Sequence, residues 1–146
     1  MNKRQRGTAL VELAFVLPLL LLVSVLTVEF GRAVYEYNTV TKSVRDAVRY
    51  LSMHTPGTHM SEARNLVVFG KIRLVGGETP LAPGLSLDPN RVPDPIWRIE
   101  GTAPVINTVT VTVRGYPFAS LFTTVFGFNF EPIIFSDISA TMRSQL

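Results

Sequence analysis

An uncharged apolar run near the N-terminus constrains this chain more than any other feature. Residues 13–28 carry no charge, and counting from Thr8 gives a stretch of 21 residues with the single acid Glu12. A helix of that length rises about 31 Å, close to the roughly 30 Å hydrocarbon core of a bilayer. The sequence therefore predicts one membrane-spanning helix at residues 8–28.

Three cations and no acid precede this run. Lys3, Arg4 and Arg6 lie in residues 1–7, and basic residues beside a span favour the cytoplasmic side. The whole chain has 14 Lys and Arg against 11 Asp and Glu, a formal charge of +3, so these three cations account for the entire excess. The positive charge indicates topology, with residues 1–7 in the cytoplasm, and it does not indicate a nucleic-acid-binding surface.

Glu12 is an acid inside the predicted span. A carboxylate in a membrane is costly unless it is neutralised or paired, which makes it a candidate functional group by default. If residues 1–7 are removed after Gly7, the new α-amino group of Thr8 lies at the depth of Glu12 in a neighbouring subunit. Thr8 and Glu12 are therefore a candidate assembly charge pair. The alternative is that Glu12 lies at the headgroup level and reaches water.

A cleavable secretory signal also begins with basic residues and an apolar core. Such a core ends at a small-x-small cleavage site, and residues 23–32 offer no good one. Glu12 is also unusual inside a signal core. The sequence favours a retained helix, and the signal is the competing interpretation.

The helix is predicted to continue beyond the membrane to about Met53, with residues 29–53 as an amphipathic half. Apolar side chains recur there at steps of three and four, and charged side chains fill the other faces. Pro18 is expected to kink or loosen the membrane half, because it lacks an amide donor and crowds the preceding turn. The predicted apolar positions are Phe30, Val34, Tyr37, Val44, Val48 and Leu51, and the charged ones are Arg32, Glu36, Lys42, Arg45, Asp46 and Arg49.

Residues 54–146 are predicted to form an extracytoplasmic head. Valines alternate with threonines at 108–114, which is typical of a half-buried strand, and the amphipathic helix half is the expected cover for its valine face. The fold class is therefore α+β, a long N-terminal helix packed on a small antiparallel β-sheet. Besides 108–114, the expected elements are a short helix from Ser61 that Gly70 ends, strands at 71–75, 96–100 and 138–142, and a proline-rich surface loop at 80–95.

No residue pattern indicates catalysis or a metal site. The two histidines, His54 and His59, share one loop with few acids, and the chain has no cysteine. Asp88, Asn90 and Asp94 lack the glycine and the distal glutamate of a calcium loop. No glycine-rich phosphate loop and no serine with a base and an orienting acid is present in the sequence. We expect no enzymatic activity, no cofactor and no metal.

Phenylalanines gather toward the C-terminal end of the head. Their simplest interpretation is a buried core, and the alternative is an exposed patch that docks onto another component. They are Phe118, Phe122, Phe126, Phe128 and Phe130.

Gly7 followed by Thr8, Ala9, Leu10, Val11 and Glu12 resembles the processing site of type IV pilin-like precursors, with glycine before the cut and glutamate at the fifth mature position. Further segments resemble the TadE-like family of minor pseudopilins, which belongs to the Tad (tight adherence) machinery that assembles Flp pili. They are residues 29–33, 37–38, 45–50, 63–70 and 140–143.

The resemblance implies cleavage after Gly7 by a prepilin peptidase and assembly into, or at the base or tip of, a Tad/Flp-type pilus used for adherence. Glu12 is expected to set the axial register of neighbouring stems. The expected stem-packing residues are Ala9, Leu10, Val11, Leu13, Phe15 and Pro18. By family analogy, a head of 93 residues (54–146) argues for a minor component, because major subunits resemble a bare stem.

The expected partners are the membrane, crossed once, the prepilin peptidase, other pilin and pseudopilin subunits and the Tad assembly platform, without nucleic acid or a small-molecule substrate. The precursor is expected in the bacterial inner membrane, and the mature form in the pilus, the periplasm or at the cell surface. The alternative function is an uncleaved single-pass anchor that carries an extracytoplasmic binding domain.

Overall fold

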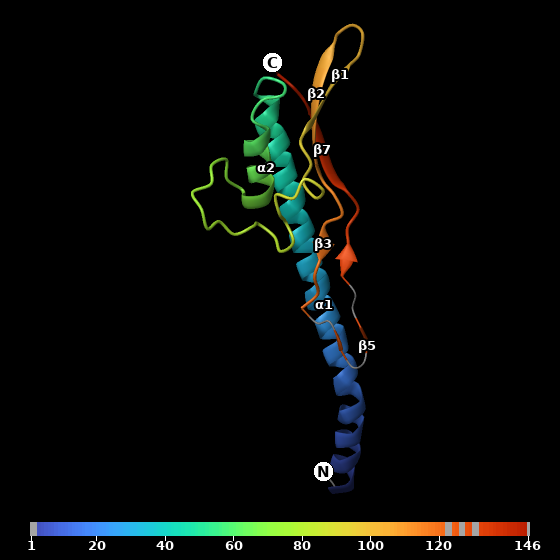
Figure 1. Cartoon of the computed structure of the whole chain (residues 1–146). Helices are drawn as coiled ribbons and strands as arrows, with labels where there is room; N and C mark the ends of the chain where they lie inside the picture. Colours follow the sequence, from blue (N-terminus) through green and yellow to red (C-terminus); the bar gives the residue numbers. More distant parts are fainter. Residues whose placement is uncertain (1–2, 122–123, 126–127, 130–131, 146) are drawn as a thin grey trace.

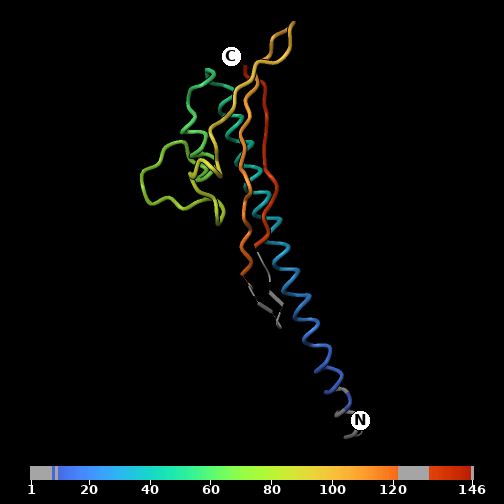
Figure 2. The backbone as a smooth tube through the Cα atoms, turned by 45° about the vertical axis from the view of Figure 1, so that its right-hand side comes forward, coloured from blue at the N-terminus to red at the C-terminus, as the bar shows by residue number. Residues whose placement is uncertain are grey.

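The fold is dominated by one helix. The computed structural model describes residues 3–121, 124–125, 128–129 and 132–145, and α1 (Lys3–Ser52) takes up 50 of them, about 75 Å of helix. Its N-terminal half projects away from the remaining chain, and its C-terminal half lies against a small head (Figures 1 and 2). The predicted α+β architecture is confirmed, and the long helix ends one residue before the predicted Met53.

The start of α1 differs from the sequence-based expectation, because the helix begins at Lys3 inside the predicted leader and not at Thr8. Gly7 costs a helix only about 1 kcal/mol relative to alanine and does not end it. The peptide bond between Gly7 and Thr8 is therefore helical in the uncut chain. The helix also continues without interruption through Pro18.

The head contains a three-stranded antiparallel sheet of β1 (Ile96–Glu100), β2 (Ile106–Val113) and β7 (Ile138–Arg143), with β2 in the centre. The three valines of β2, Val109, Val111 and Val113, are buried, while the threonines between them are half-buried. The valines share one core with the C-terminal half of α1. Three of the four expected strands and the helical cover of the valine face are confirmed.

Two short antiparallel strand pairs lie between β2 and β7 in the sequence. β3 (Pro117–Phe118) pairs with β6 (Ile133–Ile134), and β4 (Thr124–Val125) pairs with β5 (Phe128–Asn129). Phe118 is buried, in agreement with the core interpretation of the phenylalanines. The side chains of Phe122, Phe126, Phe128 and Phe130 lie outside the described part of the chain.

The second helix, α2 (Met60–Phe69), packs against α1 through Ala63, Val67 and Val68. The helix begins one residue before the predicted Ser61, and Gly70 terminates it, as predicted. Gly70 adopts φ 67° and donates its N–H to the Leu66 carbonyl oxygen at 3.0 Å, a backbone conformation that favours glycine.

The strand expected at 71–75 is wrong. No partner strand lies beside these residues in the described part of the chain, and the Val75 side chain is 95% exposed. The backbone N–H groups of Val75 and Gly76 donate to the Glu78 carboxylate at 2.7 and 3.0 Å. A local turn therefore satisfies the donors that a strand would have offered to a neighbour.

The proline-rich segment has no helix or strand, as expected, yet it does not lie only on the surface. Ala82, Leu85 and Val92 are buried and belong to the core, and the Leu81 N–H donates to the Val68 carbonyl oxygen at 2.8 Å. The prediction of an unpacked loop is therefore wrong at these apolar positions, because they fill the space beside α2.

The buried face of α1 is rotated relative to the prediction near the middle of the helix. Val44, Val48 and Leu51 are buried as expected, but Phe30 is 72% exposed and Val34 and Tyr37 are also exposed. Ala33, Glu36 and Val40 face the head instead. The polar Glu36 lies on the buried face because it accepts a hydrogen bond from the Tyr116 hydroxyl at 2.8 Å.

We expect Leu51→Ala to lower the free energy of unfolding of the head by about 2–5 kcal/mol, because Leu51 is fully buried and its truncation leaves a cavity. Arg45→Ala, at an exposed position of the same helix, is the control and should stay within about 0.5 kcal/mol. Urea unfolding of the detergent-solubilised chain can be followed through Trp97, the only tryptophan, which packs against the core. An equal effect of both substitutions would contradict the described packing.

Candidate functional site

The first candidate region is the projecting half of α1. Thr8 and Glu12 lie four residues apart, so their side chains occupy the same face of the helix. No ion pair or hydrogen bond joins Glu12 to another residue in the described part of the chain, and its side chain is exposed. The carboxylate therefore stands alone on the surface of this isolated chain.

Apolar side chains surround Glu12. The expected stem-packing residues Leu10, Val11, Leu13, Phe15 and Pro18 are all exposed, and the side chain of Ala9 lies outside the described part. α1 is long and apolar enough to cross a membrane by length and composition, and none of its most apolar stretch is buried. A core helix of a soluble protein would be covered, so this half of α1 needs lipid or other proteins around it.

The second candidate region is a polar cluster where α1 enters the head. Arg32 pairs with Glu29 at 2.9 Å and with Glu36 at 3.3 Å, one turn away on either side. Its guanidinium also lies 5.3 Å from the ring centroid of Phe118 in β3, within cation–π range. These contacts join three turns of the helix to the short strand pair.

Glu36 is the centre of this cluster. It is only 6% exposed, and the Tyr116 hydroxyl lies 2.8 Å from its Oε2 and 2.6 Å from the Pro83 carbonyl oxygen. Burial, and then the hydrogen bond to the Glu36 carboxylate, raise the pKa of Tyr116 well above its ordinary value. Tyr116 therefore stays a neutral donor, and it holds helix, proline-rich loop and sheet together.

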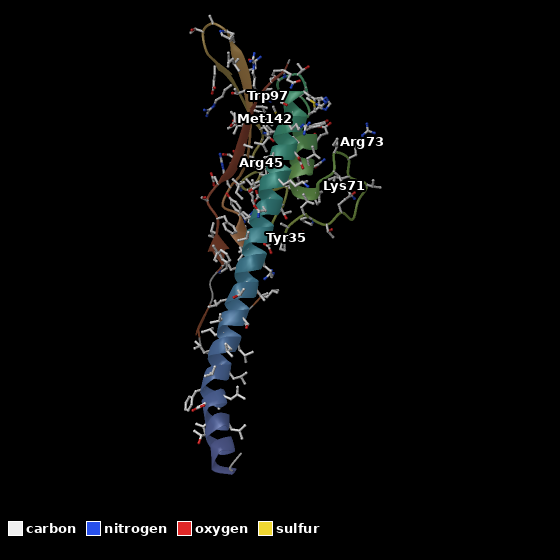
Figure 3. All side chains as sticks on the ribbon, turned by 180° about the vertical axis from the view of Figure 1, so that it is seen from behind. Tyr35, Arg45, Lys71, Arg73, Trp97 and Met142 are labelled. Carbon is white, nitrogen blue, oxygen red and sulfur yellow. The ribbon has the colours of Figure 1, made fainter. Side chains whose placement is uncertain are left out.

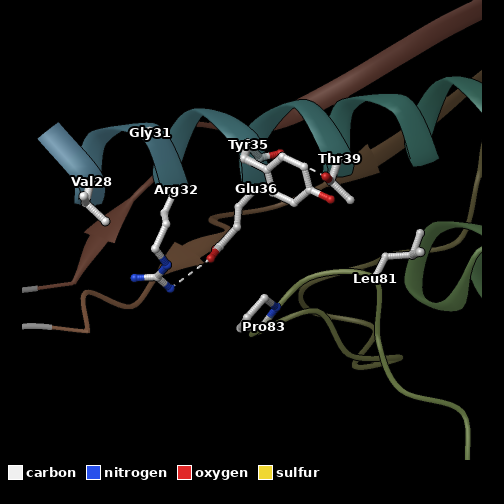
Figure 4. Close-up of a pocket in the computed structure, with 8 residues that line it drawn as sticks. All are labelled: Val28, Gly31, Arg32, Tyr35, Glu36, Thr39, Leu81 and Pro83. Carbon is white, nitrogen blue, oxygen red and sulfur yellow. Dashed lines mark hydrogen bonds and ion pairs between the residues drawn. The ribbon is translucent and has the colours of Figure 1, made fainter.

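A groove of about 520 Å³ opens beside the cluster between α1 and the proline-rich loop (Figure 4). Arg32 and Glu36 lie on its floor and already pair with each other, and Gly31 has no atom within 4 Å of where its Cβ would stand. The lining residues are Val28, Gly31, Arg32, Tyr35, Glu36, Thr39, Leu81 and Pro83. Nothing in this lining resembles a nucleophile with its base.

The two histidines lie together at the other end of the head. The ring centroids of His54 and His59 are 4.4 Å apart, and the Tyr50 ring lies 4.3 Å from the His54 ring at a tilt of 40°. Asp88 accepts the Asn90 N–H at 2.9 Å, while Asp94 pairs with Arg64 at 3.3 Å. Among the described residues, no group of three or more His, Cys, Asp or Glu could hold a metal ion.

Sequence reasoning placed Glu36 on a solvated face and did not single out Tyr116. A signal for Glu36 was present, because residues 36, 40, 44 and 51 lie at helical spacing along one face and the last three are apolar. The partner, Tyr116, is 80 residues away in sequence, and no local pattern predicts that contact. Tyr35, labelled beside α1 in Figure 3, is by contrast 73% exposed.

The chain combines a projecting apolar helix with a small head that contains an antiparallel sheet. The TadE-like protein family model matches residues 7–49, from the candidate processing glycine to the last turn of α1. The resemblance to the TadE-like family of the Tad pilus system is therefore confirmed over the long helix. No curated protein and no solved structure matches the chain.

The matched segment contains Gly7, Thr8, Glu12 and the polar residues Glu29, Arg32 and Glu36. The segments at 63–70 and 140–143, which the sequence analysis also compared with the family, lie outside the match. The TadE-like family implies a minor-pilin-like protein associated with the Tad pilus and suggests a structural, non-enzymatic role.

Tyr116→Phe should lower the free energy of unfolding at neutral pH by about 1–3 kcal/mol, because it leaves the buried Glu36 without one of its donors. The effect should depend on pH. The folded-state pKa of Tyr116 is raised above the unfolded value of 10.0, so its contribution is complete below pH 10 and is lost as the pH rises above it.

The stability difference between the wild-type chain and Tyr116→Phe should therefore shrink in alkaline solution, as measured by Trp97 fluorescence during urea unfolding at pH 7 and above pH 10. Tyr35→Phe, an exposed tyrosine of α1, is the matched control and should show neither effect. A difference that stays constant with pH would show that Tyr116 does not act as a buried neutral donor.

Proposed function

We propose that this chain is a minor pilin (pseudopilin) precursor, that a prepilin peptidase cleaves it after Gly7, and that its stem carries it into, or to the base or tip of, a Tad/Flp-type pilus used for adherence. One observation carries the proposal. The TadE-like segment begins at Gly7, and the helix half that follows is an exposed apolar surface with one unpaired carboxylate, Glu12.

The proposed division of the chain follows from this observation. Residues 1–7 are the cytoplasmic leader, 8–28 the membrane and assembly half of the stem, 29–53 the amphipathic half, and 54–146 the extracytoplasmic head. Burial of exposed apolar side chains contributes roughly 25 cal/mol per Å². The lipid of the inner membrane supplies this cover for the precursor, and neighbouring stems supply it in the fibre.

Glu12 gives the stem a preferred register. A charge inside a span costs about 2.5–3.5 kcal/mol on insertion scales, and pairing with a cation offsets that cost. Four residues of helix rise about 6 Å. A neighbour displaced axially by that distance therefore brings the α-amino group of its Thr8 level with Glu12, while a stem that keeps its leader offers no such amine.

The peptide bond after Gly7 is helical, so the backbone has to leave the helix before it can be cleaved. A peptidase needs an extended substrate backbone, and glycine lowers the cost of leaving the helix while it admits the enzyme close to the chain. The partners proposed are the peptidase, other pilin and pseudopilin subunits and the Tad assembly platform. The chain is substrate and building block, and we propose no catalytic role, cofactor or metal for it.

The mass of the membrane-extracted protein should correspond to a chain that starts at Thr8. Gly7→Leu should block this processing, because the side chain obstructs the backbone approach and stabilises the helix. Gly31→Leu changes the other glycine of α1, where an added Cβ has no atom within 4 Å, and should leave processing intact. A chain that retains Met1 in cells with an active peptidase would instead identify an uncleaved single-pass anchor with a binding head.

Glu12→Gln and Glu12→Ala should be processed normally and should enter the pilus fraction about tenfold less than the wild-type subunit, which corresponds to about 1.4 kcal/mol of lost pairing. Glu12→Asp keeps the charge on a shorter side chain and serves as the control, with a smaller loss. Immunoblots of sheared pili against membranes measure the ratio. Normal assembly of both uncharged variants would contradict the charge-pair mechanism.

A further inference from the structure

The three-stranded sheet of the head has two open edges. Its strand order is β1-β2-β7, so β1 and β7 each pair with β2 alone among the strands of the described residues. Within the same part of the chain, residues 96–100 and 138–143 form no backbone–backbone hydrogen bond outside the sheet. Edge strands of this kind leave a row of N–H and C=O groups that another chain can pair with.

Both edge strands run in the direction of α1. The Gln145 N–H donates to the Ser52 carbonyl oxygen at 2.9 Å, which places the end of β7 at the end of the helix. β1 and β7 are each antiparallel to β2, so they are parallel to each other. In Figure 1 the hairpin between β1 and β2 accordingly lies at the end of the molecule opposite to the N-terminus.

These directions limit how two copies can join through their sheets. When two stems point the same way, as a shared membrane requires, the β1 edge of one copy faces the β7 edge of a second copy as a parallel strand. Antiparallel pairing of two β1 edges would instead turn the two stems in opposite directions. The parallel pairing is therefore the one that a single membrane or fibre admits.

The backbone restricts the register of such a pair. The Ser144 N–H donates to the Asn107 carbonyl oxygen at 2.7 Å, so the odd-numbered residues of β2 direct their backbone groups toward β7 and the even-numbered ones toward β1. Given the registers of the sheet, the residues that direct these groups outward are 97 and 99 in β1 and 139, 141 and 143 in β7. In a parallel pair, Ile99 then lies level with an even-numbered residue of the second copy's β7 and bonds to the residues before and after it.

The side chains select one of these registers. With Ile99 level with Met142 of the second copy, two apolar side chains that are 76% and 39% exposed meet on one face of the sheet. Glu100 then lies level with Arg143. Both are exposed, and neither forms an ion pair in the described part of the chain. Opposite charges on adjacent strands stabilise a sheet, whereas pairing without displacement would place Arg98 beside Arg143.

The selected register displaces the second copy along its stem. Within one chain, Arg98 and Arg143 are level because both pair with Thr108, so moving Arg143 level with Glu100 is a shift of two strand residues, about 6.6 Å. The shift is away from the membrane. The proposed pairing of Glu12 with the α-amino group of a neighbouring chain requires about 6 Å in the same direction. One axial step therefore serves both contacts.

We propose that the β1 edge of one subunit binds the β7 edge of a second copy of this chain as a parallel strand, with Ile99 level with Met142 and Glu100 level with Arg143. Each copy offers a different edge to each neighbour, so the contact is head-to-tail and can repeat in a helical assembly. The inference rests on the proposed function for the common direction of the stems.

Disulfide crosslinking tests this contact directly, because the chain has no native cysteine. Ile99→Cys and Met142→Cys are introduced together into the full chain, and membranes and sheared pili are oxidised with copper phenanthroline. Within one chain β2 separates the two positions by about 10 Å, which is too far for a disulfide. We expect a ladder of dimers and higher oligomers on non-reducing gels, while each single variant stays monomeric.

Two further pairs of substitutions control this experiment. Glu100→Cys with Arg143→Cys reports the same register and keeps the test available if the first pair destabilises the head. Arg98→Cys with Arg143→Cys reports the register without displacement, and it should crosslink about tenfold less because a disulfide needs its two Cα atoms within about 7 Å.

Charge reversal tests the register in the background of Ile99→Cys and Met142→Cys. Glu100→Arg or Arg143→Glu places like charges side by side and should lower the dimer yield about fivefold. The two reversals together restore opposite charges and should recover the yield. A loss that the double reversal does not recover would contradict this register.

The same fractions separate this inference from the proposed function. A double-cysteine chain that reaches the pilus without a ladder overturns the inference and leaves the proposed function standing. Dimers of the single Ile99→Cys variant also overturn the inference, because two β1 edges would then meet. A ladder in the membrane from a chain that never enters the pilus supports the head-to-tail contact and contradicts the proposed function.

Discussion

The rest of the structure depends on one constraint: a single unbroken helix has an exposed apolar half and a half that packs against the head. The first half of α1 exposes a long row of apolar side chains, whose contact with water is unfavourable. The second half buries its apolar side chains against the head. Because both halves belong to one continuous helix, the contacts that attach the head to the second half also set how the head is placed relative to the exposed apolar half.

The attachment changes character along the helix. Toward Ser52 it is apolar, with Val44, Val48 and Leu51 packed on the valine face of β2. Toward Glu29 it becomes a polar cluster of Arg32, Glu36 and Tyr116. A buried carboxylate is tolerated only where hydrogen-bond donors surround it. The contacts of Glu36 therefore fix one relative position of the helix, the proline-rich loop and the strand. Apolar packing is less directional and would allow the helix to shift along the sheet.

Most of the architecture could be predicted from sequence because it follows local periodicity. The apolar run, the alternation of valine and threonine in β2 and the glycine that ends α2 each act within a few residues. What the sequence did not reveal depends on particular side-chain contacts, one long-range and one local. Glu36 is buried because Tyr116 reaches it, and the segment at 71–75 forms a turn because Glu78 takes its amide donors. The charge pair proposed for Glu12 involves other subunits, which a single chain does not contain.

The strands β2 and β7 run alongside the C-terminal half of α1 (Figure 1), and the end of the chain is fastened to the end of this helix, with the Gln145 N–H donating to the Ser52 carbonyl oxygen at 2.9 Å. This parallel arrangement has a mechanical consequence. A pull along the stem, as extraction of the subunit from a bilayer requires, acts on the interface between helix and sheet in shear. Many contacts then resist the force together, instead of separating one after another as they do when an element is peeled away.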